Sequence, residues 1–208
     1  MAAETSHALT TIEEVRAIVG ELSPMTAGKI FPQLDPVAID FVKRAPFLLL
    51  ATVDADGKPD VSPKGDGPGF VLVEDEGTLF IPERKGNRLC FSLTNILATG
   101  RVALIFLVPG TEETLRVHGR CELTDDPAIL ARLVERGQPA LLAMRVTVEQ
   151  CFFHCAKAFK RSHLWDASSW GEKYRVSFGK VMAPKLSGGD ELEKAIDEMV
   201  EENYRTEL

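Results

Sequence analysis

A short basic segment is the part of this sequence that is best suited to chemistry. It spans residues 81–88, and its basic and turn-forming members are Arg84, Lys85, Gly86, Asn87 and Arg88. An apolar strand pattern passes into a helical one here, and the free amides at a helix N-terminus favour an anion. Arginine can also hold a phosphate through two parallel N–H donors. The segment therefore predicts a site for one small anion, with a solvent-exposed basic turn as the alternative.

A second group of polar residues ends an earlier strand pattern. Ser62 and Lys64 bring a hydroxyl and an ammonium group close to a glycine-rich loop, residues 65–69. On a barrel, this strand end could lie beside the basic segment. Pro63 has no N–H to donate to a sheet, so the strand is predicted to lie at an edge or to carry a bulge, which would re-aim neighbouring groups.

Other kinds of site are not indicated. The basic segment is no Walker A loop, because no Ser or Thr follows Lys85. Cys151, His154 and Cys155 lie close in sequence, but no Cys-x-x-Cys pair and no second histidine at helical spacing accompanies them, so we predict no metal site. No Gly-x-Ser-x-Gly elbow is present, and hydrolase chemistry is not predicted.

The composition limits the class of protein. A chain of 208 residues suits one domain, which we predict to span residues 1–208. No apolar run approaches the roughly 20 residues that span a bilayer, and a net charge of −7 disfavours nucleic acid as a partner. Four irregularly spaced cysteines and the lack of a signal-like N-terminus lead us to expect a cytoplasmic protein.

Helical patterns flank the chain at both ends. An N-terminal helical segment is predicted over about 11–44, beginning with the capping box from Thr11 to Glu14 and starting again at Asp35 and Pro36. The first helix carries an apolar stripe that must pack on another surface, so we expect it to cover the sheet; the stripe is Ile12, Val15, Val19 and Leu22. A C-terminal helical segment is predicted over about 154–208, with an acidic helix over 190–203.

Strand patterns fill the middle of the chain. Six strands are predicted at 47–53, 58–64, 70–73, 78–81, 101–107 and 114–123, with short turns between most of them. A helix is predicted over 125–136, followed by a further strand pattern over 140–148. Many short antiparallel strands with few long crossovers predict a closed or partly closed barrel with helices outside it.

Four patterns follow one another in a specific order within residues 47–123. They are Asp-Ala-Asp-Gly-Lys-Pro at 54–59, Val-Ser-Pro-Lys-Gly at 61–65, Thr-Leu-Phe-Ile at 78–81 leading into Arg-Lys-Gly-Asn at 84–87, and Leu-Arg-Val-His-Gly-Arg at 115–120. Together they resemble the pyridoxamine 5′-phosphate oxidase-related FMN-binding split-barrel proteins. Residues 154–165 also resemble the closing segment of one bacterial branch of that family.

The resemblance implies a six-stranded antiparallel split β-barrel that forms a homodimer, with one FMN in each of two clefts between the subunits. It assigns the FMN phosphate to Arg84 and Lys85, and places residues 61–64 along the flavin ring and ribityl chain. Thr114 matches a polar residue that approaches the flavin from the partner subunit, and Lys157 and Arg161 lie in the region that reaches the substrate in the oxidases. With the rest of the basic segment, the predicted cofactor-binding residues are Val61, Ser62, Lys64, Gly65, Arg84, Lys85, Gly86, Asn87, Arg88 and Thr114.

Two departures from the oxidases bear on the reaction. The oxidases usually have a hydroxyl residue where this chain has Glu83, and a carboxylate is unfavourable beside a phosphate unless it turns outward. The Arg-x-His-Asp-Arg pattern that grips pyridoxal phosphate is also missing. These departures therefore leave the expectation of FMN binding stronger than that of pyridoxamine-phosphate oxidation.

The expected function is that of an FMN-dependent oxidoreductase acting on a small molecule. The flavin carries the electron or hydride transfer and the protein supplies position and electrostatics, so no catalytic residue is assigned. Lys64 and Arg161 would favour an anionic reduced flavin if they face the ring. The alternatives are a flavin carrier or sensor without turnover, and a split barrel that uses haem or a deazaflavin.

Overall fold

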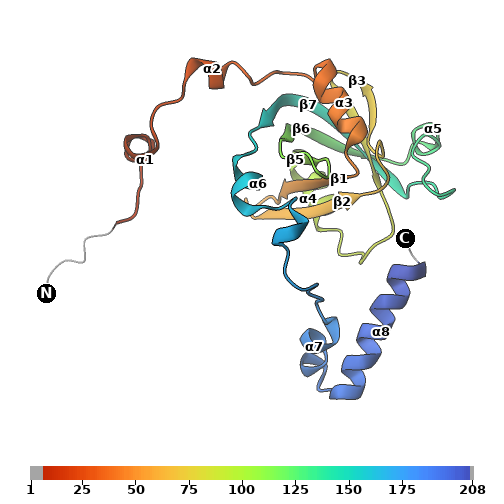
Figure 1. Cartoon of the computed structure of the whole chain (residues 1–208). Coiled ribbons are helices and arrows are strands. Elements are labelled where there is room, and N and C mark those ends of the chain that lie inside the picture. Colours follow the sequence, from red (N-terminus) through yellow and green to blue (C-terminus); the bar gives the residue numbers. More distant parts are fainter. Residues whose placement is uncertain (1–6, 207–208) are drawn as a thin grey trace, which may run out of the picture.

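One antiparallel sheet of seven strands lies at the centre of the molecule (Figure 1). The computed structural model describes residues 7–206. The strands are β1 (Phe47–Val53), β2 (Pro59–Gly65), β3 (Leu72–Asp75), β4 (Thr78–Glu83), β5 (Arg101–Leu107), β6 (Thr114–Thr124) and β7 (Leu142–His154). They lie in the order β2-β1-β5-β6-β7-β4-β3. The predicted class, an antiparallel split β-barrel with peripheral helices, is confirmed. The sheet has seven strands instead of the six that the resemblance implied, and the seventh, β7, corresponds to the strand pattern over 140–148.

The turns of the sheet are encoded locally. In the β1–β2 hairpin, Asp54 Oδ1 accepts hydrogen bonds from the amides of Asp56 and Lys58 at 2.9 and 2.8 Å. In the β3–β4 hairpin, Asp75 Oδ1 accepts one from the amide of Gly77 at 2.8 Å. Aspartate side chains that bind the backbone two residues ahead reverse the chain without help from tertiary contacts. This is why both hairpins were predictable.

Strand β7 is longer than the sequence pattern indicated. The predicted strand ended at Val148, but β7 continues to His154 and pairs with the whole of β6. The register between the two strands shifts at His118 and Gly119 of β6, which pair with Gln150 and Val148. Glu149 is therefore an extra residue in β7, and this bulge breaks the alternation along β7 and hides its continuation from a simple alternation rule. A Cβ at Gly119 would lie 2.1 Å from the carbonyl oxygen of Thr147, so the strands approach this closely only because the residue is glycine.

The core of the barrel lies on one face of the strands. Side chains that are fully buried alternate with half-exposed ones along β1, β5 and β6. The largest buried members of these three strands are Leu48, Leu50, Leu104, Phe106, Leu115 and Val117. Because residues directly opposite in an antiparallel pair share a face, Ser62 and Lys64 of β2 lie on the same face as Leu50 and Leu48. The polar end of β2 therefore borders the core.

Two helices close this core. Helix α3 (Pro36–Arg44) begins at Asp35, whose side chain accepts a hydrogen bond from the amide of Ala38, as predicted. Helix α4 (Phe91–Thr99) packs against β1 and places Asn95 where its amide nitrogen donates to Thr52 Oγ1 at 3.0 Å. The helix predicted over 125–136 is limited to α5 (Pro127–Leu130), after which the chain turns back through residues 131–139.

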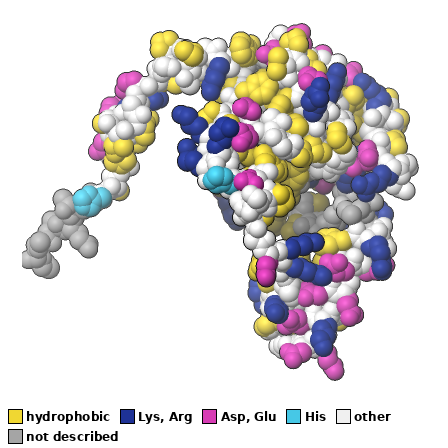
Figure 2. All heavy atoms as spheres, in the orientation of Figure 1, with side chains coloured by type: hydrophobic (Ala, Val, Ile, Leu, Met, Phe, Trp, Pro, Cys, Tyr) yellow, Lys and Arg dark blue, Asp and Glu magenta, His cyan; other side chains and the backbone are white. Residues whose placement is uncertain are grey.

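The first helix does not cover the sheet. Helix α1 (Ile12–Val19) begins with the predicted capping box at Thr11, and the four-residue α2 (Pro24–Ala27) follows. Neither helix buries a residue, and Ile18 and Val19 are 71% and 70% exposed. We call residues 7–33, which carry these two helices, the arm. Figure 1 shows the arm running away from the barrel, and Figure 2 shows apolar side chains along it. The prediction of a cover helix was wrong within this chain.

The end of the arm is tied to the barrel by hydrogen bonds to the β3–β4 turn, where Gln33 Nε2 donates to Glu76 Oε2 at 2.7 Å, and to β7. The amide of Phe31 donates to the carbonyl of Cys151 at 2.9 Å, and the amide of Cys151 donates back at 2.8 Å. The partner strand β4 pairs with β7 only as far as Thr147, so this part of the β7 edge is open to the arm. The arm therefore starts beside the second half of β7.

The chain beyond the barrel forms a short helix and then a helical hairpin. Helix α6 (Lys157–Ser162) and the 3₁₀ turn η1 (Ala167–Ser169) come first, and the hairpin consists of α7 (Phe178–Met182), the 3₁₀ turn η2 (Pro184–Leu186) and α8 (Asp190–Thr206). Asp197 of α8 accepts hydrogen bonds from the hydroxyl of Ser177 and the amide of Gly179 at 2.5 and 2.8 Å. These bonds lower the pKa of Asp197. The predicted acidic helix over 190–203 is thereby confirmed as α8.

Candidate functional site

The ends of β2 and β4 meet through an ion pair. These strands lie far apart in the sheet order, yet Lys64 Nζ lies 2.5 Å from Glu83 Oε2. Both side chains are largely buried, with exposed fractions of 16% and 19%. Glu83 is therefore turned onto Lys64, and its charge is compensated there rather than by turning outward. The pair compensates the charge of a lysine that was predicted to lie along the flavin.

A second ion pair lies beside the first one. Arg84 Nε lies 2.8 Å from Asp66 Oδ2, and Arg84 Nη1 donates to the carbonyl of Gln138 at 3.4 Å. The two pairs have opposite polarity across the split: the cation of the first pair, Lys64, belongs to β2, whereas the cation of the second pair, Arg84, follows β4. We call these four residues, Lys64, Glu83, Arg84 and Asp66, the clasp. The clasp joins the two sides of the split by side chains, where no backbone ladder connects β2 to β4.

A hydroxyl cluster lies under the start of α4. Ser62 Oγ and Ser92 Oγ are 2.7 Å apart, and Ser62 Oγ also donates to Asp60 Oδ2 at 3.2 Å. Ser92 is buried and stands in the first turn of α4, so the cluster ties this helix to β2. The helix begins at Cys90, which provides no side-chain hydrogen bond to the first turn. The amides of that turn are the kind of donor that suits an anion.

The basic segment between β4 and α4 is exposed beyond Arg84. Lys85, Gly86, Asn87 and Arg88 all lie at the surface. Asn87 Oδ1 accepts a hydrogen bond from the amide of Leu89 at 3.0 Å, and Arg88 and Cys90 have positive φ angles of 58° and 54°. These features make a tight turn into α4. The segment therefore presents two exposed cations, Lys85 and Arg88, next to the start of a helix.

The other predicted residues lie elsewhere in this chain. Thr114 is buried at the start of β6 and is separated from β2 by β1 and β5. Lys157 and Arg161 are exposed on α6, which follows β7. Val61 is 58% exposed and lies on the opposite face of β2 from Lys64. The structure thus brings Lys64, Gly65 and Arg84 together, and leaves Thr114, Lys157 and Arg161 apart from them.

A cationic and aromatic patch occupies the outer face of β6 and β7. The Arg116 guanidinium lies 5.9 Å from the centre of the Phe152 ring, and His118 meets the same ring edge-on at 5.7 Å. Burial lowers the pKa of His154 from its usual value, and the charges of Arg116 and Lys29 lower it further. Among the described residues, the buried Nε of Arg116 has no hydrogen-bond partner.

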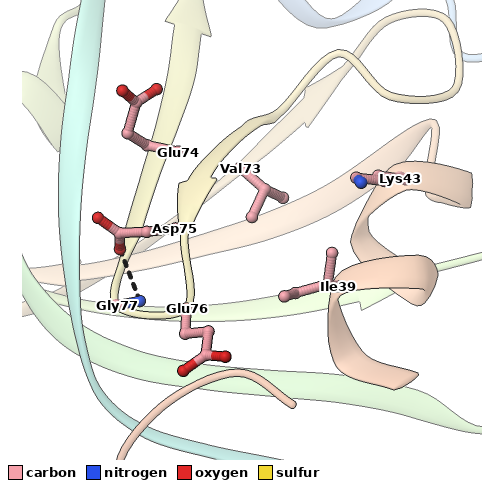
Figure 3. A pocket seen from close by; sticks show the side chains of 7 residues that line it. All are labelled: Ile39, Lys43, Val73, Glu74, Asp75, Glu76 and Gly77. Atoms are coloured by element: carbon pink, nitrogen blue, oxygen red, sulfur yellow. Dashed lines mark hydrogen bonds between the residues drawn. The ribbon is translucent and has the colours of Figure 1, made fainter. Parts of the chain in front are cut away.

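A surface hollow of about 620 Å³ lies elsewhere, at the β3–β4 turn (Figure 3). Its acidic side chains are already engaged: Glu74 pairs with Arg132 at 2.6 Å, and Glu76 accepts a hydrogen bond from Gln33 at 2.7 Å. None of the predicted cofactor residues lines it. Lys43 is the cation that borders the hollow. An acidic hollow of this kind does not suit a phosphate, so we do not assign the site to it.

The described part of the chain contains neither a cluster of metal-ligating side chains nor a helix suited to spanning a membrane. Within residues 7–206, no three His, Cys, Asp or Glu side chains gather in a way that could hold a metal ion. None of the helices in that range is long and apolar enough to cross a bilayer.

Sequence reasoning missed the partners of the predicted residues. It named Lys64 and Arg84 but not Asp66, and it left out Asp60 and Ser92, which join the hydroxyl cluster. The only signal was the placement of opposite charges at two strand ends, with Lys64 near Asp66 and Glu83 next to Arg84. That signal becomes specific only after the strands have been placed in space.

The arrangement fits the needs of a flavin mononucleotide in two respects. The exposed cations Lys85 and Arg88 and the uncapped first turn of α4 suit a phosphate. The outer face of β2 offers apolar side chains, with Val61 and Pro63 exposed, and these suit a ring. The edge position of β2 confirms the prediction made from Pro63, and its pairing with β1 runs without a bulge.

Comparison with known proteins identifies the family. Among solved structures, the chain resembles a variant of HupZ from Group A Streptococcus, with 20% identity over 58% of this chain and 99% of that one, and a TM-score of 0.48. It also resembles an FMN-binding protein from Syntrophomonas wolfei (10% identity, 56% and 88% covered, TM-score 0.44) and HutZ, a haem storage protein from Vibrio cholerae (19%, 58% and 94%, 0.43). No curated protein matches the sequence. The family model for pyridoxamine 5′-phosphate oxidase matches residues 34–155, which is more than half of the chain, and the chain therefore belongs to that family.

Proposed function

We propose that this protein binds FMN and acts as an FMN-dependent oxidoreductase on a small molecule. The observation that carries the proposal is the basic turn that leads from β4 into the uncapped N-terminus of α4, within a chain of this family. Bound FMN would supply hydride or electron transfer. The residues of the chain would hold its phosphate and shape an apolar slot for its ring.

The proposed roles follow from position. Arg84, Lys85 and Arg88 would hold the phosphate together with the amides of the first turn of α4. The exposed face of β2, which carries Val61, would lie along the ring. Lys64 is paired with Glu83, so it would contribute a compensated charge rather than a free cation. Pyridoxamine-phosphate oxidation is not part of the proposal.

We further propose that the protein is a homodimer in which the second copy completes the flavin site. The outer face of the sheet is apolar and only half buried along β1 and β5, where Leu49, Ala51 and Ile105 lie. Apolar sheet surface of this kind is usual where another chain packs. A second copy would also bring its own Thr114 and α6 to the site.

The first experiment is the visible absorption spectrum of freshly purified protein, with any released ligand identified by mass. The two visible bands of oxidised flavin and the mass of FMN are expected. A haem or deazaflavin spectrum would replace the cofactor in the proposal, and a colourless protein that fails to take up added FMN would remove it. Reduction by NADH or NADPH followed by reoxidation would separate an oxidoreductase from a carrier, which should show neither at a useful rate.

Two measurements test the site and the dimer. Arg84→Ala should weaken FMN binding by about 2 kcal/mol, on the order of 30-fold, because a charged hydrogen-bond donor to the phosphate is lost. Unchanged affinity in a fluorescence titration would place the phosphate elsewhere. Light scattering should give twice the monomer mass of 22.9 kDa. A monomer mass would remove the two-subunit site from the proposal.

A further inference from the structure

Asp66 holds one edge of the Arg84 guanidinium. The carboxylate is 11% exposed, and its Oδ2 lies 2.8 Å from Arg84 Nε. The chain fixes Asp66 in turn, because its amide donates to the carbonyl of Pro46 at 3.0 Å and its Oδ1 accepts from the amide of Gly67 at 3.3 Å. The anchoring of Asp66 therefore does not depend on Arg84 alone.

The rest of the guanidinium is left for another acceptor. An arginine has five N–H donors, of which the bond to Asp66 uses one and the bond to Gln138 uses a second. Three donors remain, and none of them donates a further hydrogen bond to any of residues 7–206. A phosphate can be gripped through the terminal nitrogens while Nε stays bonded to the carboxylate.

We infer that Asp66 is a positioning residue of the anion site, acting through Arg84. An arginine that is free in solution loses much rotamer freedom when it grips a ligand, and holding it in place beforehand shifts that cost from binding to folding. The inference rests on the proposed function for the identity of the anion. It goes further by giving a role to an acidic residue, which on charge alone would be expected to weaken binding of a phosphate.

The other half of the clasp explains how Asp66 reaches Arg84. Residues 65–69 contain three glycines and a proline, so this loop has little stiffness of its own. Lys64 directly precedes this loop and Glu83 directly precedes Arg84, so the Lys64–Glu83 ion pair holds the starts of both segments together. Since β2 and β4 share no backbone ladder, this pair sets the distance across which Asp66 and Arg84 meet.

The test compares Asp66→Asn with a matched control. Asp40→Asn removes the charge from the same kind of contact, Arg44 Nε at 2.7 Å, but on the exposed surface of α3. Fluorescence titrations should show about tenfold weaker FMN binding for Asp66→Asn and no change for Asp40→Asn. Riboflavin, which has no phosphate, should bind Asp66→Asn as it binds the wild type. Tighter FMN binding in Asp66→Asn would mean that the carboxylate competes with the phosphate, which would overturn the inference.

A second background separates positioning from general loosening of the fold. If Asp66 acts through Arg84, then Asp66→Asn should cause no further loss of FMN affinity in Arg84→Ala protein, because coupled residues are not additive. An equal loss in both backgrounds would refute the inference. So would an equal loss of riboflavin binding, which a disturbed ring slot would produce.

The inference can also be tested without FMN. The Arg84 Nε–H signal in the ¹⁵N NMR spectrum should be protected in the wild type and lost in Asp66→Asn. The backbone amide signals of residues 84–88 can be followed in both proteins, and inorganic phosphate should shift them at a lower concentration in the wild type than in the variant. If wild-type protein binds no FMN but shows this difference with phosphate, the proposed function fails and the inference stands. If FMN binds and the two proteins respond equally to phosphate, the inference fails and the proposed function stands.

Discussion

Glu83→Gln should destabilise the protein far more than a change of the same kind at the surface. The Lys64–Glu83 pair is 2.5 Å long and its side chains are 16% and 19% exposed, whereas the Arg44–Asp40 pair is 2.7 Å long and 67% and 61% exposed. Removing the charge of Glu83 leaves a largely buried ammonium without its counter-charge, which should cost about 2 kcal/mol. The exposed helix pair should contribute only about 0.4 kcal/mol.

Urea unfolding measures this difference. With a slope of about 2 kcal/mol per molar urea, Glu83→Gln should lower the midpoint by about 1 M, and Asp40→Asn by about 0.2 M, with unchanged slopes. The double variant Lys64→Met, Glu83→Leu removes both charges, so it should regain most of the lost stability. Equal midpoints for Glu83→Gln and Asp40→Asn would refute the reasoning, as would a double variant no more stable than Glu83→Gln.

Two further predictions concern the barrel itself. Gly119→Ala would place a Cβ 2.1 Å from the carbonyl oxygen of Thr147, a backbone atom that no rotamer change can move. Thermal unfolding should therefore show a loss of about 3 kcal/mol or more in the free energy of unfolding. Gly171→Ala, whose Cβ would meet nothing within 4 Å, should be as stable as the wild type. Burial raises the pKa of Cys121 from an ordinary value near 9 to about 12. The folded state thus holds this proton more tightly than the unfolded chain does. The difference between the two pKa values corresponds to about 4 kcal/mol of folding stability. This contribution is complete below pH 9 and is lost as the pH rises towards 12. Cys121→Ala should flatten this alkaline decline in urea midpoints measured from pH 8 to 11, and an unchanged decline would assign it to other groups.

Much of the barrel could be predicted because its signals are local. The alternation along β6, with Leu115 and Val117 buried and Arg116 half-exposed, follows from the period of a strand, and the edge position of β2 follows from the missing N–H of Pro63. The cap at Asp35 is a contact over three residues. Each of these features is decided within a few positions of the sequence.

The clasp could not be predicted in the same way. Arg84 and Asp66 are 18 residues apart, and their contact depends on the curvature of a sheet whose two ends meet only after all seven strands have formed. Composition suggested a basic anion site, and it could not show that Lys64 and Arg84 each have a carboxylate of their own. The cover helix was mispredicted because the apolar stripe of α1 is present, but its spacing does not say whether the barrel of this chain buries it.

The two outer strands of the sheet also determine how the protein avoids uncontrolled self-assembly. An edge strand that offers a long row of free amides can recruit another chain and start a fibril. Here β3 has only four residues, and β2 carries two prolines, Pro59 and Pro63, with the charged Asp60 and Lys64 between and beyond them. Strand β3 is too short to pair stably with another chain, and β2 lacks an N–H donor at two of its seven positions. Neither outer strand therefore offers a long row of free amides to which the sheet of another copy could add.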